Sequence, residues 1–174
     1  HSFPTRRSSD LNPSFTSRHD TEFTSVDVEI SWIDSHEDVM QLEERWIRYV
    51  LQEIRGEFGN EIKATFGSEI VVPGLPFPRI TMTEAYEILD RKGHNTGRDE
   101  KGDLDPEGER ILCRHFQESL GHEFVFVTEY PTTVRPFYHM RPEDKPELTK
   151  SFDLLWKGLE VTTGAQREHR HDVL

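Results

Sequence analysis

The chain has 174 residues and a mass of 20.4 kDa, with 33 acidic against 21 basic residues and a formal net charge of −12. One cysteine, Cys113, excludes an intramolecular disulfide framework and any zinc site built from cysteines. The acidic balance argues against a general nucleic-acid-binding surface, and no apolar run approaches the roughly 20 residues of a membrane span. These features predict one mixed globular domain of a cytoplasmic protein.

The first eleven residues, HSFPTRRSSDL, have no hydrophobic period and no core-forming pattern. They read as the codon-by-codon translation of a common short-read sequencing adapter. We therefore expect residues 1–11 to be adapter-derived and not native, and we exclude them from the fold. The polar segment that follows, to residue 22, is predicted to be a loop.

Strict alternation over residues 23–33 predicts a long strand. One face carries apolar side chains and the other carries Asp27 and Glu29 between serines; the apolar positions are Val26, Val28, Ile30 and Trp32. Two carboxylates on the second face suggest that this face is wet or functional.

Ser35 and Asp38 form a capping-box pattern that predicts the start of a helix, which helical spacing extends to about Arg55. Gly56 and Gly59 are expected to end this helix, with only weak helical character over 57–68. A short strand over 70–72 and an extended proline-rich connection should follow. Thr83 is then predicted to cap a helix that runs through about Leu89.

After a loop over 92–104, Asp105-Pro106 predicts the N-terminus of a helix that ends near Leu120. Strands are predicted over 124–127 and 135–140. Two further strands, 151–156 and 159–163, should form a hairpin around Lys157-Gly158. The overall pattern predicts an α+β fold with a mostly antiparallel sheet.

The predicted hairpin places two carboxylates on one face. With a two-residue turn, Asp153 and Glu160 become diagonal neighbours about 7 Å apart at their bases. Such a pair can hold one Mg²⁺ ion, although a solvated sheet face with ordinary acids gives the same pattern. Arg167, just beyond the hairpin, carries a planar guanidinium that suits bidentate capture of a carboxylate or phosphate.

Three segments together are much more specific than any single motif: SRHDTEFTSVDVE at 17–29, RPFYHM at 135–140 and SFDLLWKGLEVTTGAQREHRHD at 151–172. They resemble the catalytic domain of the archaeal-type aspartyl-tRNA synthetases, and the resemblance covers residues 12–174. It implies the class II synthetase core, an antiparallel sheet flanked by helices. It also implies that aspartate is activated with ATP and Mg²⁺ to aspartyl-adenylate and transferred to tRNA.

The resemblance implies roles for five residues near the predicted hairpin. Asp153 and Glu160 match the acidic pair that holds Mg²⁺ near the ATP phosphates, and Thr163 matches a hydroxyl residue near the metal and the substrate. Simple hairpin parity puts the neighbouring threonine on that face instead, so a β-bulge is needed. Arg167 matches the arginine that reads the side-chain carboxylate of aspartate, and Tyr138 matches a substrate-pocket tyrosine.

The N-terminal segment matches further family positions. Asp27 corresponds to the acid that receives the substrate ammonium group. Arg18, His19 and Asp20 correspond to the motif 2 loop near the ATP phosphates and the tRNA end, and Phe23 to a residue that faces adenine. Arg18, His19, Glu160 and Arg167 are therefore the expected catalytic residues.

Departures from the family pattern suggest a partial domain. Asp10 stands where motif 2 begins with an arginine, and motif 1, motif 3 and the anticodon-binding domain are missing. We therefore expect residues 12–174 to be part of the catalytic domain of a longer parent, inactive or nearly so alone. The resemblance implies a homodimeric parent that acts on tRNA(Asp), with tRNA(Asn) as an open alternative.

Two other functions stay open. An asparaginyl-tRNA synthetase is the nearest rival, but it usually has a WMIEPE-like strand where this chain has FTSVDVE, so Asp27 favours the aspartyl enzyme. The second open alternative is a synthetase-like module that binds a ligand without catalysing a reaction.

Overall fold

The computed structural model describes residues 9–11, 22–95 and 102–173, and it divides at residue 33 into two units. In the first unit, strand β1 (Ser9–Leu11) pairs antiparallel with strand β2 (Glu22–Thr24). The origin of residues 1–11 from a sequencing adapter stays a prediction.

The predicted strand over 23–33 is wrong beyond Thr24, because residues 25–33 have no regular secondary structure. Val26 and Val28 are 67% and 59% exposed, and Trp32 has a positive φ of 64°. Alternation alone cannot make a strand, since the backbone also needs a neighbour to complete its hydrogen bonds. In the described part of this unit, only the three-residue β1 provides one.

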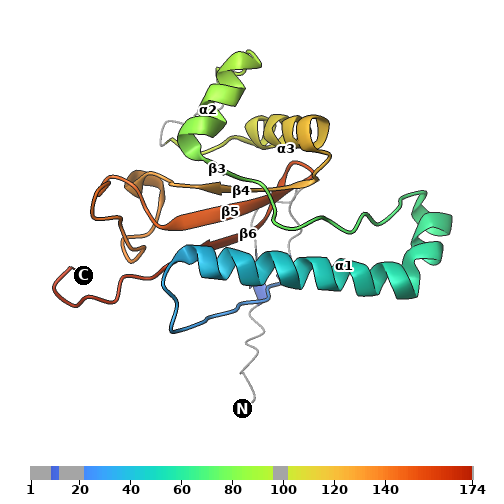
Figure 1. The fold of residues 1–174 in the computed structure, drawn as a ribbon, viewed down its shortest axis with the longest axis horizontal. Coiled ribbons are helices and arrows are strands. Elements are labelled where there is room, and N and C mark those ends of the chain that lie inside the picture. Colours follow the sequence, from blue (N-terminus) through green and yellow to red (C-terminus); the bar gives the residue numbers. More distant parts are fainter. Residues whose placement is uncertain (1–8, 12–21, 96–101, 174) are drawn as a thin grey trace. The chain divides into compact units, whose positions relative to one another are not determined.

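The second unit is built on a four-stranded sheet, with β3 (Arg79–Thr81), β4 (Phe124–Thr128), β5 (Ser151–Trp156) and β6 (Leu159–Ala165) in that spatial order. β3 and β4 are parallel, whereas β4–β5 and β5–β6 are antiparallel. The α+β class is confirmed. The sheet is mixed, however, because β3 reaches β4 through helical crossovers (Figure 1).

Helix α1 (His36–Phe66) begins as the sequence predicts and ends later. The Ser35–Asp38 capping box is present, with Ser35 N–H donating to Asp38 Oδ2 at 2.9 Å. Gly56 and Gly59 do not end the helix, because a glycine inside a helix costs only about 1 kcal/mol. The helix ends instead where Gly67 adopts a left-handed conformation with φ of 67°.

The two shorter helices start at capped residues. Helix α2 (Met82–Arg91) is capped by Thr81 and not by Thr83, because Glu84 lies three residues after Thr81 and completes a capping box. Helix α3 (Pro106–Leu120) is capped by Asp105, as predicted. A short 3₁₀ helix, η1 (Thr132–Val134), follows β4, and residues 70–72 do not form the predicted strand.

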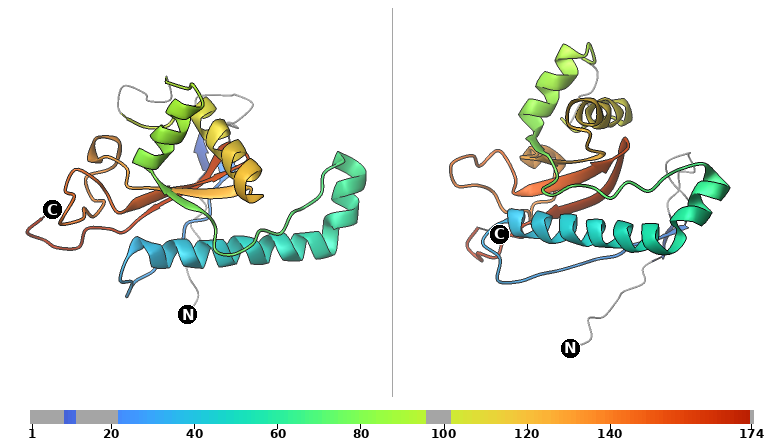
Figure 2. Two further views of the ribbon diagram at one scale, coloured as in Figure 1. Left: turned by 45° about the horizontal axis from the view of Figure 1, so that its top comes forward. Right: turned by 45° about the vertical axis from the view of Figure 1, so that its right-hand side comes forward.

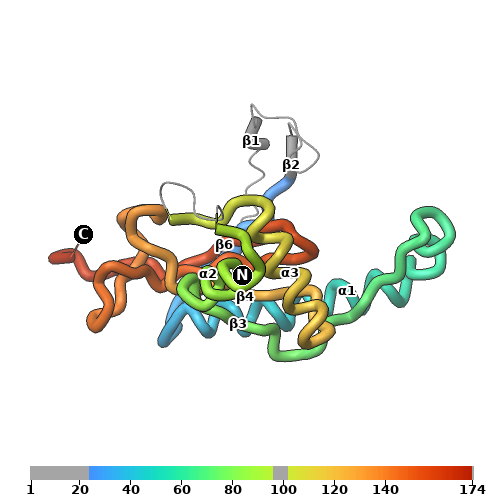
Figure 3. Tube along the Cα trace, turned by 90° about the horizontal axis from the view of Figure 1, so that it is seen from above, coloured from blue at the N-terminus to red at the C-terminus, as the bar shows by residue number. Residues whose placement is uncertain are grey.

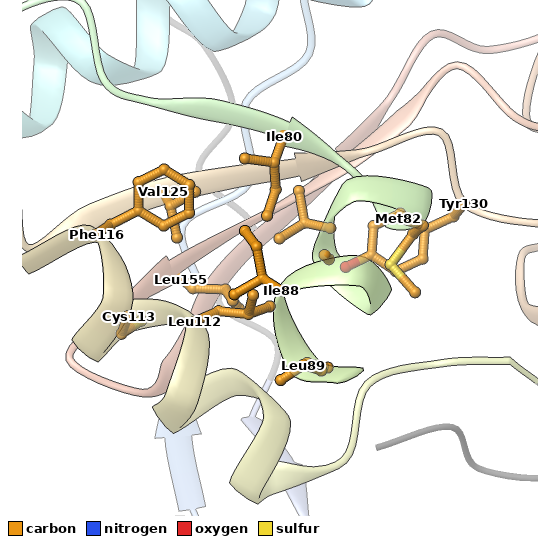
Figure 4. Close-up of a cluster of buried hydrophobic side chains, with 12 residues drawn as sticks. Ile80, Met82, Ile88, Leu89, Leu112, Cys113, Phe116, Val125, Tyr130 and Leu155 are labelled. Carbon is orange, nitrogen blue, oxygen red and sulfur yellow. The ribbon is translucent and has the colours of Figure 1, made fainter. Parts of the chain in front are cut away.

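Helices cover both faces of the sheet: α2 and α3 lie on one face and α1 on the other (Figures 1 and 2). Alternation along the strands makes two cores. Aliphatic side chains of the strands, such as Val125 and Leu155, face α2 and α3 (Figure 4). Aromatic side chains, such as Phe124 and Phe126, pack on the face that Met40 of α1 covers.

The far end of α1 lies away from the strands. The last turns of the helix extend beyond the sheet and bend away from the direction of the earlier turns (Figure 3). Among the described residues, no helix is long and apolar enough to cross a membrane.

The β5–β6 hairpin is confirmed in its turn and in its irregular register. Lys157 and Gly158 both have positive φ, 53° and 84°, as a tight two-residue hairpin turn requires. Leu155 pairs with Glu160 and Leu154 pairs with Thr162, so Val161 is the extra residue of a bulge. Asp153 consequently pairs with Thr163.

Gly164 provides a test of the close packing in this hairpin. A Cβ atom at this position would lie 2.3 Å from Cζ of the buried Phe152 ring. We expect Gly164→Ala to lower the free energy of unfolding by about 2–3 kcal/mol, because the core must shift to admit the methyl group.

Urea unfolding measures this loss, with Gly74→Ala as the control, because a Cβ on Gly74 would meet no atom within 4 Å. The control should stay within about 0.5 kcal/mol of the wild type. Equal stability of the two variants would contradict the packing described here.

Candidate active site

The candidate site lies on the β5–β6 hairpin, on the face that α2 and α3 cover. Asp153 stands in the middle of β5, a strand whose first five residues are all buried. The bulge lets Thr163 lie directly opposite Asp153, and Glu160 opposite Leu155 shares that face. The hairpin therefore brings together the three residues predicted to bind metal.

A further residue, Arg135, completes this cluster, although the sequence reasoning assigned it no role. Its Nη2 donates to Oδ2 of Asp153 in a buried ion pair, and its Nη1 donates to Oγ1 of Thr163 at 3.2 Å. The guanidinium carbon lies 3.7 Å from the ring centroid of Tyr130. The signal was present in the sequence, because a carboxylate in a buried strand needs a counter-ion.

The electrostatics of the site couple its two carboxylates. Loss of solvation raises the pKa of Glu160 to about 7, repulsion from Asp153 adds to this rise, and Arg135 partly offsets it. The side chain of Glu160 keeps contact with water, so solvent screening moderates the effect. Burial, and then the Asp153 carboxylate, raise the pKa of Tyr130 well above its usual value.

The cluster has oxygen donors of the kind that Mg²⁺ prefers. Oδ1 of Asp153 is buried and has no hydrogen-bond partner in the described part of the chain, which leaves it able to bind a cation. No group of three or more His, Cys, Asp or Glu side chains that could hold a metal occurs among residues 9–11, 22–95 and 102–173. Any metal would therefore depend on two carboxylates, a hydroxyl and groups of a bound substrate.

The predicted strand over 135–140 is wrong: these residues form turns after η1 and make only one bridge, His139 to Arg167. Pro136 has no N–H to donate to a ladder, which explains why no strand forms. The segment nevertheless runs beside the end of β6, with Met140 N–H donating to Gln166 O at 2.9 Å.

This arrangement brings Tyr138 and Arg167 together. The guanidinium carbon of Arg167 lies 4.7 Å from the ring centroid of Tyr138, and Glu168 N–H donates to Tyr138 O at 2.9 Å. Burial and the nearby Arg135 and Arg167 cations lower the pKa of His139 to about 4. His139 is therefore neutral at pH 7 and adds no charge between the two arginines.

The remaining predicted residues belong to the N-terminal part. Asp27 is exposed in the first unit, where its Oδ1 accepts a hydrogen bond from Ser25 Oγ at 3.0 Å. Phe23 lies in β2. Arg18, His19 and Asp20 lie outside the described residues, so their roles stay predictions.

The raised pKa of Glu160 predicts how stability depends on pH. A carboxyl group whose folded-state pKa exceeds its usual value of 4.5 stabilises the fold below that value and loses this contribution as the pH rises through about 7. Glu160→Gln should remove the loss. The difference in free energy of unfolding, Glu160→Gln minus wild type, should therefore rise between pH 5 and pH 8. The rise should be up to about 1 kcal/mol after solvent screening.

Urea unfolding at several pH values tests this effect. Val161→Gln places the same amide at the neighbouring exposed position, where no acid is replaced, and should follow the wild type. A difference between Glu160→Gln and the wild type that does not change with pH would contradict the coupling.

Comparison with known proteins places the chain in a family. The family described as "tRNA synthetases class II (D, K and N)" has a model that matches residues 10–174. The aspartate–tRNA(Asp) ligase of Pyrococcus abyssi is 45% identical over 159 residues, which cover 91% of this chain and 36% of that protein. The aspartate–tRNA(Asp/Asn) ligase of Aeropyrum pernix is 44% identical, with 93% and 36% covered.

Solved structures agree with this placement. The aspartyl tRNA synthetase from Entamoeba histolytica superposes with a TM-score of 0.82 at 29% identity, over 92% of this chain and 33% of that one. The asparaginyl-tRNA synthetase from Pyrococcus horikoshii, complexed with asparaginyl-adenylate, gives 0.82 at 30% identity, over 97% and 38%. The chain thus spans about a third of the length of its relatives, and it belongs to the class II tRNA synthetase family that comprises the D, K and N enzymes.

Proposed function

We propose that the protein to which this chain belongs is an aspartate–tRNA ligase, and that residues 12–174 are part of its catalytic domain. The observation that carries the proposal is the bulged hairpin, which sets Asp153, Glu160 and Thr163 on one face with Arg167 beyond its end. The curated relatives at 44–45% identity are named as aspartate ligases, which supports this choice. Because the chain spans about 36% of their length, the activity is proposed for the whole protein.

The chemistry proposed is aspartate activation. The α-carboxylate of aspartate attacks the α-phosphate of ATP, pyrophosphate leaves, and the aspartyl group is then transferred to the 3′ end of tRNA. No protein nucleophile is required, so the protein must hold two anions together and offset their charge. Arg18, His19, Asp20 and Phe23 are the residues proposed to bind ATP, together with Glu160.

Asp153, Glu160 and Thr163 are the residues that would hold Mg²⁺. When bound there, Mg²⁺ would offset phosphate charge and orient the phosphates. The buried oxygen of Asp153 that lacks a partner and the oxygen-only donor set fit such an ion.

Selectivity for aspartate is assigned to a second group of residues. Arg167, held over the Tyr138 ring, would pair with the side-chain carboxylate of aspartate, and Asp27 would receive the ammonium group. Asparagine has no side-chain carboxylate to pair with Arg167, so it would be rejected. The proposed RNA substrate is tRNA(Asp); tRNA(Asn) is a second candidate because the Aeropyrum relative is named for both. A cytoplasmic homodimer is the proposed form of the whole protein.

An asparaginyl-tRNA synthetase is the competing function, favoured by the TM-score of 0.82 with the Pyrococcus horikoshii enzyme. ATP–pyrophosphate exchange by the full-length protein distinguishes the aspartyl from the asparaginyl enzyme. We expect exchange that depends on aspartate, with asparagine at least about 100-fold poorer in kcat/KM. A preference for asparagine, or no exchange with either amino acid, would contradict the proposal.

The proposed role of Arg167 can be tested in the same exchange assay. Arg167→Gln should lower kcat/KM for aspartate by at least about 100-fold, because the substrate carboxylate loses its charged partner. Arg141→Gln, which replaces an exposed arginine of the same region, is the control and should change little. Equal activity of the two variants would exclude Arg167 as the carboxylate receptor.

A further inference from the structure

Arg135 is a buried cation to which neither the sequence pattern nor the proposed chemistry gives a task. Its side chain is 11% exposed and that of Asp153 is 5% exposed. Burying a guanidinium is costly unless its charge is paired. Asp153 supplies that pairing, and the Tyr130 ring at 3.7 Å supplies an electron-rich face for the cation.

The contacts of Arg135 occupy one of the two side-chain oxygens of Asp153 and leave the other without a partner in the part of the chain that the structure describes. Oδ2 of Asp153 accepts from Arg135 Nη2, whereas Oδ1 has no hydrogen-bond partner among the described residues. Arg135 Nη1 also donates to Oγ1 of Thr163 at 3.2 Å, so the guanidinium touches two of the three proposed metal-binding residues. Within the described ranges, one carboxylate oxygen of Asp153 is thus left without a partner, while the other is paired with the fixed positive charge of Arg135.

We propose that Arg135 is a positioning residue that aims Asp153 into the site and, as an internal cation, keeps the acidic pair from binding a free divalent cation tightly. This inference rests on the proposed function in one respect, that Asp153 and Glu160 take a divalent cation. With both acids ionised, the charge of the two carboxylates and Arg135 sums to about −1, whereas the carboxylates alone carry −2. The metal therefore binds well only together with an anion such as a polyphosphate, because the anion can pair with the arginine and bind the metal at the same time.

Arg135 offsets the negative charge around Glu160, whereas the neighbouring acids add to it. His139 is neutral at pH 7, and Asp103 and Glu109, which also act on Glu160, are acidic. Among the described charged groups that act most on the pKa of Glu160, Arg135 is the cation. Its removal should therefore leave the site strongly anionic.

Binding of Mn²⁺ to the 174-residue chain, measured by electron paramagnetic resonance of the free ion at pH 8, tests the proposal without any activity assay. Arg135→Met keeps a long apolar side chain against Tyr130 and removes the charge. We expect it to bind free Mn²⁺ at least about ten-fold more tightly than the wild type, because the repulsion between the two cations is lost. Arg141→Met, at an exposed position, should leave the affinity unchanged.

Arg135→Lys separates the charge from the shape of the side chain. It should bind free Mn²⁺ as weakly as the wild type, and circular dichroism verifies that each variant is folded. ATP, added in equilibrium dialysis, should raise protein-bound Mn²⁺ several-fold for the wild type and for Arg135→Lys, and little for Arg135→Met.

The outcomes separate the two proposals. Equal or weaker Mn²⁺ binding by Arg135→Met, or tighter binding by Arg135→Lys, would overturn the role of Arg135 and leave the acidic pair as a metal site. No Mn²⁺ binding by any of the four proteins, with or without ATP, would overturn both.

Discussion

A carboxylate in the middle of a buried strand is the constraint on which the rest of the site depends. Asp153 is 3% exposed in β5, between core residues on both sides. A buried charge without a partner is expensive, and breaking a buried pair by removing one member costs about 3–5 kcal/mol. Arg135 must therefore be buried as well, and Tyr130 must present its ring to it. The segment between β4 and β5 consequently has to fold back over the sheet to deliver both residues.

The same hairpin contributes to the aromatic core on one face of the sheet and carries the candidate site, beside the aliphatic core, on the other. Phe152 and Leu154 face α1 and form part of the aromatic core, while Asp153 faces the opposite side. The bulge at Val161 preserves this division across β6, because Thr162 donates to Glu43 of α1 while Thr163 stays opposite Asp153. Without the additional residue, Thr162 would lie opposite Asp153 and Thr163 would face α1.

Local signals predicted the structure well where the local chemistry is sufficient. The capping residues Ser35 and Asp105 mark the starts of α1 and α3, and Lys157-Gly158 marks the hairpin turn. The need for a bulge followed from hairpin parity together with the family resemblance. The failures depend on context beyond the local pattern. Residues 25–33 alternate but pair with no strand in the described part of their unit, and Pro136 lacks an N–H that a strand over 135–140 would need. Arg135 was missed because its role comes from Asp153, 18 residues away along the chain.

The central claim is that Asp153, Glu160 and Arg135 form one electrostatic cluster that accepts a divalent cation. The side-chain carboxyl carbon of Glu160, followed by NMR as a function of pH with and without Mg²⁺, tests it most directly. The structure predicts a titration midpoint near pH 7 that moves to lower pH when Mg²⁺ and ATP are present. A midpoint near the usual 4.5 that Mg²⁺ and ATP leave unchanged would contradict the cluster.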